Sequence, residues 1–226
     1  MTSVFAKYIP QAWPYRYSGT IKVFTIAGGT PSDPKVAEGW LKSKLADKDL
    51  RIQEAVAEIM VDRGIDADEA AEQLDLYKHL NGFKKDPNRD GELYIEGRQL
   101  KASIKEAASV AAASGKLPLK PWGKTSKFIH GFVAEHIQVV EERLYLGVTA
   151  PSRVLQSFPK NARTGQTGIQ YTEICEDVSF DFTVISDHNF SDSEWAKLWL
   201  TGEMQGIGAS RSQSFGRYEV TRWDKA

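Results

Sequence analysis

The chain switches between two hydrophobic periods, and this switching constrains its fold more than any other feature. Apolar residues recur at every second position in residues 15–26 and 178–184, which predicts strands with one buried face. They recur three or four residues apart in residues 97–115 and 191–206, which predicts amphipathic helices. The full predicted order is strand, inserted helices, strand and helix, several strands, helix, strand. We therefore expect an α+β fold with a ferredoxin-like or modified RRM core, βαββαβ, in which an antiparallel sheet carries its helices on one face.

Both predicted core helices have recognisable faces or ends. In the first, the apolar stripe consists of Leu100, Ile104 and Ala107 or Ala108. The second begins with Ser191 as N-cap and Glu194 three residues later, a capping box. Its core-facing residues are predicted to be Trp195, Leu198 and Trp199.

The remaining segments predict one domain over residues 1–226 with two additions. Residues 35–79 are amphipathic, helical in pattern and acidic, and we assign residues 35–90 to a helical insertion. Residues 151–170 are rich in Gly, Pro, Ser and Thr and form a predicted thumb-like β-hairpin arm. We expect strands in residues 132–140 and 143–148, and a strand pair or one long bent strand in residues 169–186.

Composition limits the class of protein. The formal net charge is −1, so any surface that binds nucleic acid must be a local basic patch. The single cysteine, Cys175, excludes an intramolecular disulfide and a multi-cysteine zinc site. No window approaches the roughly 20 apolar residues that span a bilayer. We expect a cytoplasmic protein with no membrane contact, no metal and no cofactor.

Residues 202–220 contain the main binding candidate. Glycines there allow the main chain to approach another backbone closely, while exposed N–H groups and arginines attract phosphate. The candidate residues are Gly206, Gly208, Ser210, Arg211, Ser212, Phe215, Gly216 and Arg217. A flexible connector between helix and strand explains the composition equally well.

Residues 121–127 contain Gly-Lys-Thr but do not form a nucleotide-hydrolysing phosphate loop. That motif requires a glycine five positions before the Gly-Lys pair, where Pro118 stands. The lysines, including Lys124 and Lys127, remain either a solvated loop or a set of phosphate contacts.

No catalytic constellation is visible in the sequence. His130 and His136 lie six residues apart on a predicted strand and hence on one face, where either is a candidate general base. A structural histidine is the alternative interpretation at both positions.

The segment "GIGASRSQSFGRYEV" resembles the C-terminal glycine-rich loop of the RAMP superfamily, the CRISPR-associated RNA-binding proteins with ferredoxin-like folds. The matching residues are Gly206, Gly208, Arg211, Ser212, Phe215, Gly216 and Arg217. Ser214 departs from the pattern, because the family usually has glycine there.

A second match is "YIEGRQLKASIKEAAS", which is similar to the turn and first helix of the backbone subunits that line guide RNA. Gly97, Leu100 and Lys101 align, whereas Glu96 and Ala102 are among the departures from that motif. The arm before residues 173–182 is similar in position to the family's thumb hairpin.

The resemblance implies non-catalytic binding of single-stranded RNA, the guide RNA, by a repeating backbone subunit of a CRISPR-like ribonucleoprotein or filament. It implies a homo-oligomer or multi-subunit complex and favours RNA over DNA. The further RNA-contacting candidates are Gly97, Arg98, Lys101, Lys105, Lys124, Lys127, Arg153, Phe158, Lys160 and Arg163.

Three alternatives remain open at this point. One is an endoribonuclease of the same fold, with Asp33 in the loop after the first strand, or His130 or His136, as the catalytic candidates. The second is a single-stranded DNA-binding protein, which differs only in contacts to the 2′-hydroxyl. The third is a structural protein whose acidic helices dock a partner.

Overall fold

A computed structural model describes residues 13–31, 80–118, 121–123, 125–158 and 169–225. The helices predicted within residues 35–79 lie outside the described residues, as do Asp33, Lys124, Lys160 and Arg163. The chain forms two compact units. The first comprises Met1–Ala27, Lys84–Ala150 and Cys175–Ala226, and the second comprises Gly28–Phe83 and Pro151–Ile174.

The first unit contains the ferredoxin-like core. Its four sheet strands, in chain order, are β1 (Tyr15–Ala27), β6 (Ile137–Val139), β9 (Gln170–Ser186) and β10 (Tyr218–Lys225). Their order across the sheet is β10-β1-β9-β6, so that the first and third strands are central and the second and fourth are outer. Both outer strands pair antiparallel with their neighbours. Helix α4 (Gly97–Ala113) precedes the second strand and α6 (Asp192–Gln205) precedes the fourth, which confirms the predicted α+β fold.

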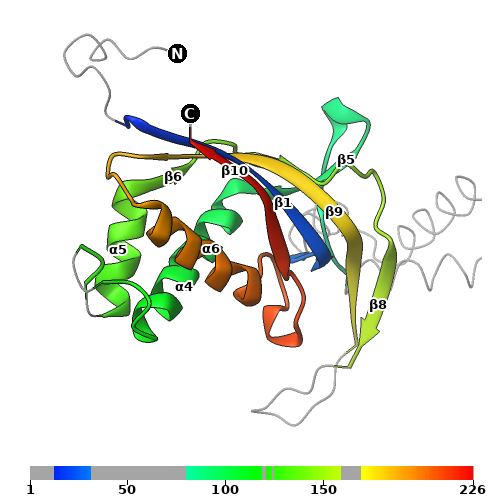
Figure 1. Ribbon diagram of the computed structural model, residues 1–226. Helices are drawn as coiled ribbons and strands as arrows, with labels where there is room; N and C mark the ends of the chain where they lie inside the picture. Colours follow the sequence, from blue (N-terminus) through cyan, green and yellow to red (C-terminus); the bar gives the residue numbers. More distant parts are fainter. Residues whose placement is uncertain (1–12, 32–79, 119–120, 124, 159–168, 226) are drawn as a thin grey trace, which may run out of the picture. The chain divides into compact units, whose positions relative to one another are not determined.

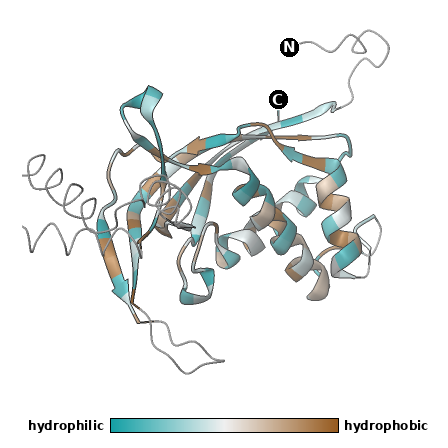
Figure 2. Cartoon of the chain, turned by 180° about the vertical axis from the view of Figure 1, so that it is seen from behind, coloured by the Kyte–Doolittle hydropathy of each residue, from teal (hydrophilic) through white to brown (hydrophobic). Residues whose placement is uncertain are grey.

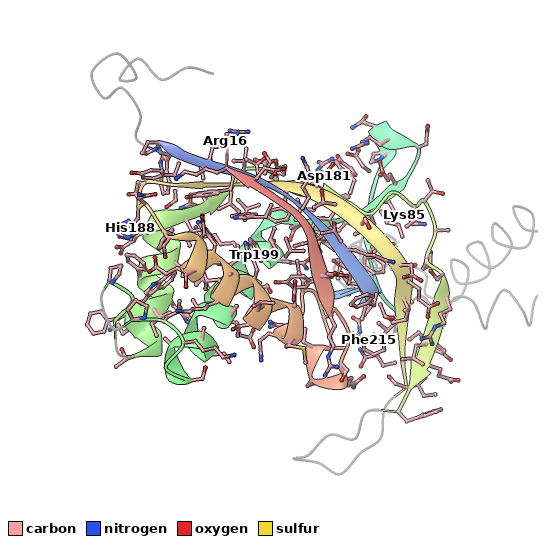
Figure 3. All side chains as sticks on the ribbon, in the orientation of Figure 1. Arg16, Lys85, Asp181, His188, Trp199 and Phe215 are labelled. Carbon is pink, nitrogen blue, oxygen red and sulfur yellow. The ribbon has the colours of Figure 1, made fainter. Side chains whose placement is uncertain are left out.

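The helices of this unit pack on one face of the sheet (Figure 1). The predicted stripe of α4 is buried, with Leu100, Ile104, Ala107 and Ala108 each no more than 2% exposed. On α6, both hydrogen bonds of the Ser191–Glu194 capping box are present, and Trp195, Leu198 and Trp199 are buried as predicted. Trp199 points from α6 toward the sheet, whereas Arg16 and Asp181 lie on the opposite face (Figure 3). Burial of these apolar side chains between helices and sheet forms the core.

The prediction of a strand over residues 132–140 is wrong for its first half. Helix α5 (Ser126–His136) occupies these positions, and only Ile137–Val139 form a strand. Ile129 and Val133 are buried four residues apart, which is the spacing of a helix rather than of a strand. Brown and teal segments alternate along α5 in Figure 2, as expected for an amphipathic helix.

Strand β9 is one continuous strand of 17 residues, as one of the two predicted alternatives had it. Asp177 interrupts its regularity with φ = 50°, a left-handed conformation that L-residues adopt rarely. Beyond it Val178, Phe180 and Phe182 are buried at alternate positions, in the predicted pattern. The chain thus bends within the strand while one face stays in the core.

A small second sheet in the same unit is held by a buried carboxylate. It consists of β4 (Lys84–Asp86), β5 (Glu92–Glu96) and β7 (Arg143–Tyr145), and the short 3-10 helix η1 (Pro87–Arg89) follows β4. Asp86 accepts hydrogen bonds from Tyr145 Oη and Arg143 Nη1, both at 2.5 Å, and from the main-chain N–H of Asn88 at 3.0 Å. The Tyr145 hydroxyl, followed by the Asn88 N–H, holds the pKa of Asp86 below its ordinary value.

The second unit contains short strands. These are β2 (Thr30–Pro31), β3 (Leu80–Gly82) and β8 (Arg153–Ser157), together with Gln170–Ile174 of β9. Strand β8 pairs antiparallel with β9, from Arg153 opposite Ile174 to Ser157 opposite Gln170. Strand β8 lies within residues 151–170, the predicted arm, of which residues 159–168 lie outside the described residues. No described helix is long and apolar enough to cross a membrane.

Candidate nucleic-acid interface

The base of the glycine-rich loop is closed by its own glycines. Gly206 and Gly216 both have φ = +79°, and the N–H of Ile207 donates to the carbonyl of Gly216 at 2.8 Å. A Cβ atom on Gly216 would lie 1.8 Å from the carbonyl oxygen of Ile207. Glycine is therefore required here for the two sides of the loop to meet, whatever the loop binds.

The same base is fastened to the core. The N–H of Gly216 donates to Thr25 O on β1 at 2.7 Å, and the buried hydroxyl of Ser103 on α4 donates to Gly206 O at 2.9 Å. Ala209 forms a bridge with Ala27 of β1. The N–H groups of Ile207 and Gly216 are thus donors within the protein, and an anion can reach them only by displacing these bonds.

The tip of the loop, residues 210–214, is built differently. It is a short 3-10 turn, η2 (Arg211–Gln213), flanked by Ser210 with φ = 54° and Ser214 with φ = 68°. Ser212, Gln213 and Ser214 are exposed. Ser214 adopts a left-handed conformation, which glycine accepts without steric cost, at the position where the resembling family has glycine.

The two arginines of the loop differ in their surroundings. Arg211 forms an ion pair with Glu106 of α4, so part of its charge is already neutralised within the protein. Arg217 is exposed, and its carbonyl accepts from the N–H of Phe24, which fixes the backbone at that point. Residues 206–217 contain no acidic residue, so the loop carries a local positive charge.

The Gly97 turn is more fully occupied by contacts within the protein. A Cβ atom on Gly97 would lie 1.9 Å from Glu141 O, and the N–H of Gly97 donates to Glu142 O at 2.9 Å. Arg98 pairs with Glu96. Lys101 Nζ donates to Ala134 O at 3.1 Å and to Gln138 Oε1 at 2.6 Å.

Electrostatics at this turn oppose phosphate binding. The adjoining cleft of about 390 Å³ is lined by Glu96, Glu141 and Glu142 as well as by Arg98 and Lys101. Burial, and secondarily the nearby charge of Lys105, lowers the pKa of Lys101. The structure therefore brings the predicted residues of the turn together, but with carboxylates beside them.

The other sequence candidates are distributed over the two units. In the first, Lys127 near the start of α5 is exposed, and Phe128 beside it is 70% exposed, a residue that sequence reasoning missed. In the second, Arg153 is exposed on β8, and Phe158 is 62% exposed just beyond it. Within each unit these side chains are accessible to a ligand.

The two histidines do not share a face. Because they lie six residues apart on a helix rather than on a strand, their directions differ by about 120°. His136 Nδ1 lies 2.8 Å from Asp187 Oδ1, and its ring is 6.3 Å from that of His188. The sequence did not predict that Asp187 and His188 lie beside His136, because residues 132–140 were assigned to a strand and His136 is in fact the last residue of a helix.

The sheet face turned away from the helices carries balanced charges. Lys22 Nζ lies 3.5 Å from Asp177 Oδ1, and Arg222 Nη2 lies 3.2 Å from Asp181 Oδ1. Phe24 is 47% exposed on the same face of β1. With Lys22 and Arg222 already paired, this face is neither a basic patch nor a row of stacking rings.

Comparison with known proteins identified no matching protein-family model and no matching curated protein. One solved structure that resembles the chain is described as a "Cryo-EM structure of the Type III-B Cmr-beta bound to cognate target RNA". The alignment has a TM-score of 0.49 and 13% sequence identity, and it covers 93% of this chain and 60% of that chain. We draw no conclusion about function from a likeness at this level.

Proposed function

We propose that this chain binds single-stranded RNA without cleaving it, as one subunit of a multi-subunit ribonucleoprotein or filament. The proposed contact is the tip of the glycine-rich loop together with Arg217. The observation that carries the proposal is the contrast within this loop: a base locked by main-chain hydrogen bonds supports a tip with exposed serine hydroxyls and Arg211, and exposed Arg217 lies beside it.

Such a tip suits the sugar–phosphate backbone. Serine hydroxyls and arginine side chains are common donors to phosphate oxygens, and these contacts position a strand without reading its sequence. They require local rather than overall positive charge, which agrees with a formal net charge of −1. Because the base is rigid, little conformational entropy is lost when the tip binds.

The sequence pattern gives the proposal its preference for RNA. Seven residues of the loop match the RAMP pattern, and the loop lies between the last helix and the last strand of a ferredoxin-like core, as in that superfamily. This resemblance also motivates the proposed assembly with further subunits. In the second unit, exposed Phe158 is a candidate for stacking on a splayed base.

One observation favours a second candidate function, RNA cleavage. The contact between Asp187 and His136 Nδ1 resembles pairs in which a carboxylate orients an imidazole and leaves Nε2 to accept a proton. His188 lies nearby as a second titratable group. Both members of the pair are partly exposed, so substrate access is not blocked.

Fluorescence anisotropy with a labelled single-stranded RNA tests the binding proposal. The double variant Arg211→Ala and Arg217→Ala should bind more weakly, and the negative slope of log K against log salt should become shallower by about 0.7 for each phosphate that the variant no longer neutralises. Glu106→Gln should have the opposite effect, because it releases Arg211 from its carboxylate partner. Arg16→Ala, on the outer sheet face, is the control for removal of a positive charge outside the loop, and it is compared with each single loop variant, Arg211→Ala and Arg217→Ala.

Equal weakening by Arg16→Ala and by each single loop variant would mean that the loop does not bind the RNA. Cleavage is tested separately with end-labelled RNA, with and without Mg²⁺. Product formation that His136→Ala abolishes would replace the non-catalytic proposal with the nuclease.

A further inference from the structure

A cleft of about 620 Å³ lies between α6 and β10, away from the glycine-rich tip. Aromatic side chains dominate it. Tyr17, Trp195 and Trp199 are buried, and Trp223 is partly exposed. The Tyr17 and Trp223 rings stack at a centroid distance of 5.1 Å, and Trp195 and Trp199 each contact Trp223 at 5.1 and 5.2 Å. The cleft is therefore a rigid, ring-lined surface.

One side of the cleft is the edge of a sheet. Among the described residues, β10 pairs only with β1 and ends the strand order. An edge strand has a row of main-chain N–H and C=O groups without a strand partner, and these groups readily pair with another extended chain. One of them, the N–H of Val220, donates to Glu203 Oε1 at 3.0 Å, so the edge is partly protected by a side chain of α6.

The border of the cleft is acidic. Asp192, Glu203 and Asp224 line it, against a single ammonium group, that of Lys225. Beside them α6 exposes Leu200 at 64% and, one turn on, Met204 at 62%. Asp224 shares the guanidinium of Arg222 with Asp181, at 3.6 Å from Arg222 Nη1, whereas Asp192 and Glu203 form no ion pair among the described residues. The border therefore keeps an excess of negative charge, which is opposite in sign to the proposed RNA contact.

Unpaired polar groups also concentrate in the residues that line the cleft. Tyr17 Oη, Trp195 Nε1 and Trp199 Nε1 are buried and make no hydrogen bond among the described residues. Buried polar groups usually have partners, and exceptions call for an explanation. Their coincidence with an aromatic cleft, a free edge and an acidic border distinguishes this surface from an ordinary gap between helix and sheet.

We propose that the cleft binds an extended segment of a partner protein, which adds to β10 as a strand and places an Arg or Lys side chain over the aromatic rings. The arrangement of a groove between an edge strand and a helix is the one in which peptides are bound by strand addition. Main-chain hydrogen bonds to β10 supply affinity, and the acidic border selects a basic side chain.

The dimensions agree with a short peptide. Residues 192–203 of α6 extend over about 17 Å at 1.5 Å per residue. An extended segment of about five residues covers that length. Every second side chain of the segment faces the cleft. A cation at one of these positions lies over Trp223 and is attracted by the ring face, and an apolar side chain two residues along covers Leu200. This proposal does not rest on the RNA-binding proposal, and either can fail alone.

The test uses a fluorescein-labelled peptide, Arg-Thr-Leu-Thr-Arg, with the full-length chain, followed by anisotropy; its Arg and Leu residues stand two apart, so that both kinds of side chain lie on the face turned to the cleft. Asp224→Asn combined with Leu200→Ser should weaken binding at least about tenfold, because it removes a border carboxylate and an exposed apolar side chain. Both residues are exposed, so folding should be preserved. Asp177→Asn combined with Phe24→Ser, which removes one carboxylate and one exposed apolar side chain from the outer sheet face, is the matched control and should change the affinity less than about twofold.

Strand addition has its own signature. Only every second main-chain N–H of an added strand donates to the edge, so N-methylation at one set of alternate residues should abolish binding while methylation at the other set preserves it. A peptide with Glu in place of Arg should not bind. Absence of binding, or equal weakening by the control variant, would each overturn the proposal.

Discussion

The two glycine-bearing turns of the first unit look alike in sequence but differ in what surrounds their cations. In both, glycine is required by the protein's own packing, with Gly216 facing Ile207 O and Gly97 facing Glu141 O. At the Gly97 turn, Arg98 and Lys101 both have protein partners, and three glutamates line the adjoining cleft. At the glycine-rich loop, Arg217 is exposed and the segment has no acidic residue.

This difference shows that glycines in a sequence motif indicate close packing of the protein's own backbone, and that they do not by themselves indicate contact with a ligand. Glycine is needed at both turns because backbone meets backbone at both. A binding loop differs from a structural turn in that its cationic side chains are not already paired with carboxylates of the protein. Substitution of the glycines, which both turns require, should therefore have the larger effect, on stability. Substitution of the arginines, whose surroundings differ, should have a smaller effect, on RNA affinity.

The largest effect is expected on stability, when the glycine that each turn requires is replaced by alanine. Gly216→Ala places a Cβ atom 1.8 Å from Ile207 O, and Gly97→Ala places one 1.9 Å from Glu141 O, so the backbone must move in both variants. We expect each to lower the free energy of unfolding by about 3 kcal/mol, measured by urea denaturation.

Gly91→Ala is the control for backbone strain alone. Gly91 has φ = +77°, but a Cβ atom there meets nothing within 4 Å. Its cost should be about 1 kcal/mol. If Gly216→Ala costs no more than Gly91→Ala, the base of the loop is not tightly closed.

A smaller effect is expected on RNA affinity, when the arginine of each turn is replaced by alanine. Arg217→Ala should weaken binding of single-stranded RNA about tenfold, because Arg217 has no carboxylate partner among the described residues and its guanidinium can form a charge-assisted hydrogen bond to phosphate. Arg98→Ala should change the affinity little, because Arg98 is already paired with Glu96. Anisotropy at two salt concentrations measures both. The reverse order of effects would move the RNA contact to the Gly97 turn.

The sequence predicted the fold well where one period dominated a segment. The alternation in β1 and β9, the stripe of α4 and the capping box of α6 all appear as expected, because each is a local signal that tertiary packing reinforces. The prediction of a strand over residues 132–136 was wrong because a short apolar run fits the period of either a strand or a helix. The structure shows the helix, in which Ile129 and Val133 are buried on the same side.

The candidate site was less predictable, for a physical reason. Spacing identified Gly206, Gly216 and Gly97 as special positions, but it could not tell whether a ligand or the protein's own backbone approaches them. It also could not show that Glu106 pairs with Arg211 from 105 positions away, or that Asp187 meets His136. Such pairs depend on tertiary contacts between distant elements, which no local pattern encodes.

The smallest effect concerns the one position where the loop departs from the pattern it resembles. Ser214 holds φ = 68°, a conformation that costs an L-residue about 1–2 kcal/mol, while glycine adopts it freely but loses more entropy on folding. The two contributions nearly cancel, so Ser214→Gly should raise the free energy of unfolding by about 0.5 kcal/mol. Its hydroxyl is one of several at the tip, so RNA affinity should fall less than about twofold, in contrast to Arg217→Ala. A large decrease of affinity in Ser214→Gly with unchanged stability would mean that the hydroxyl, and not the guanidinium, makes the principal contact.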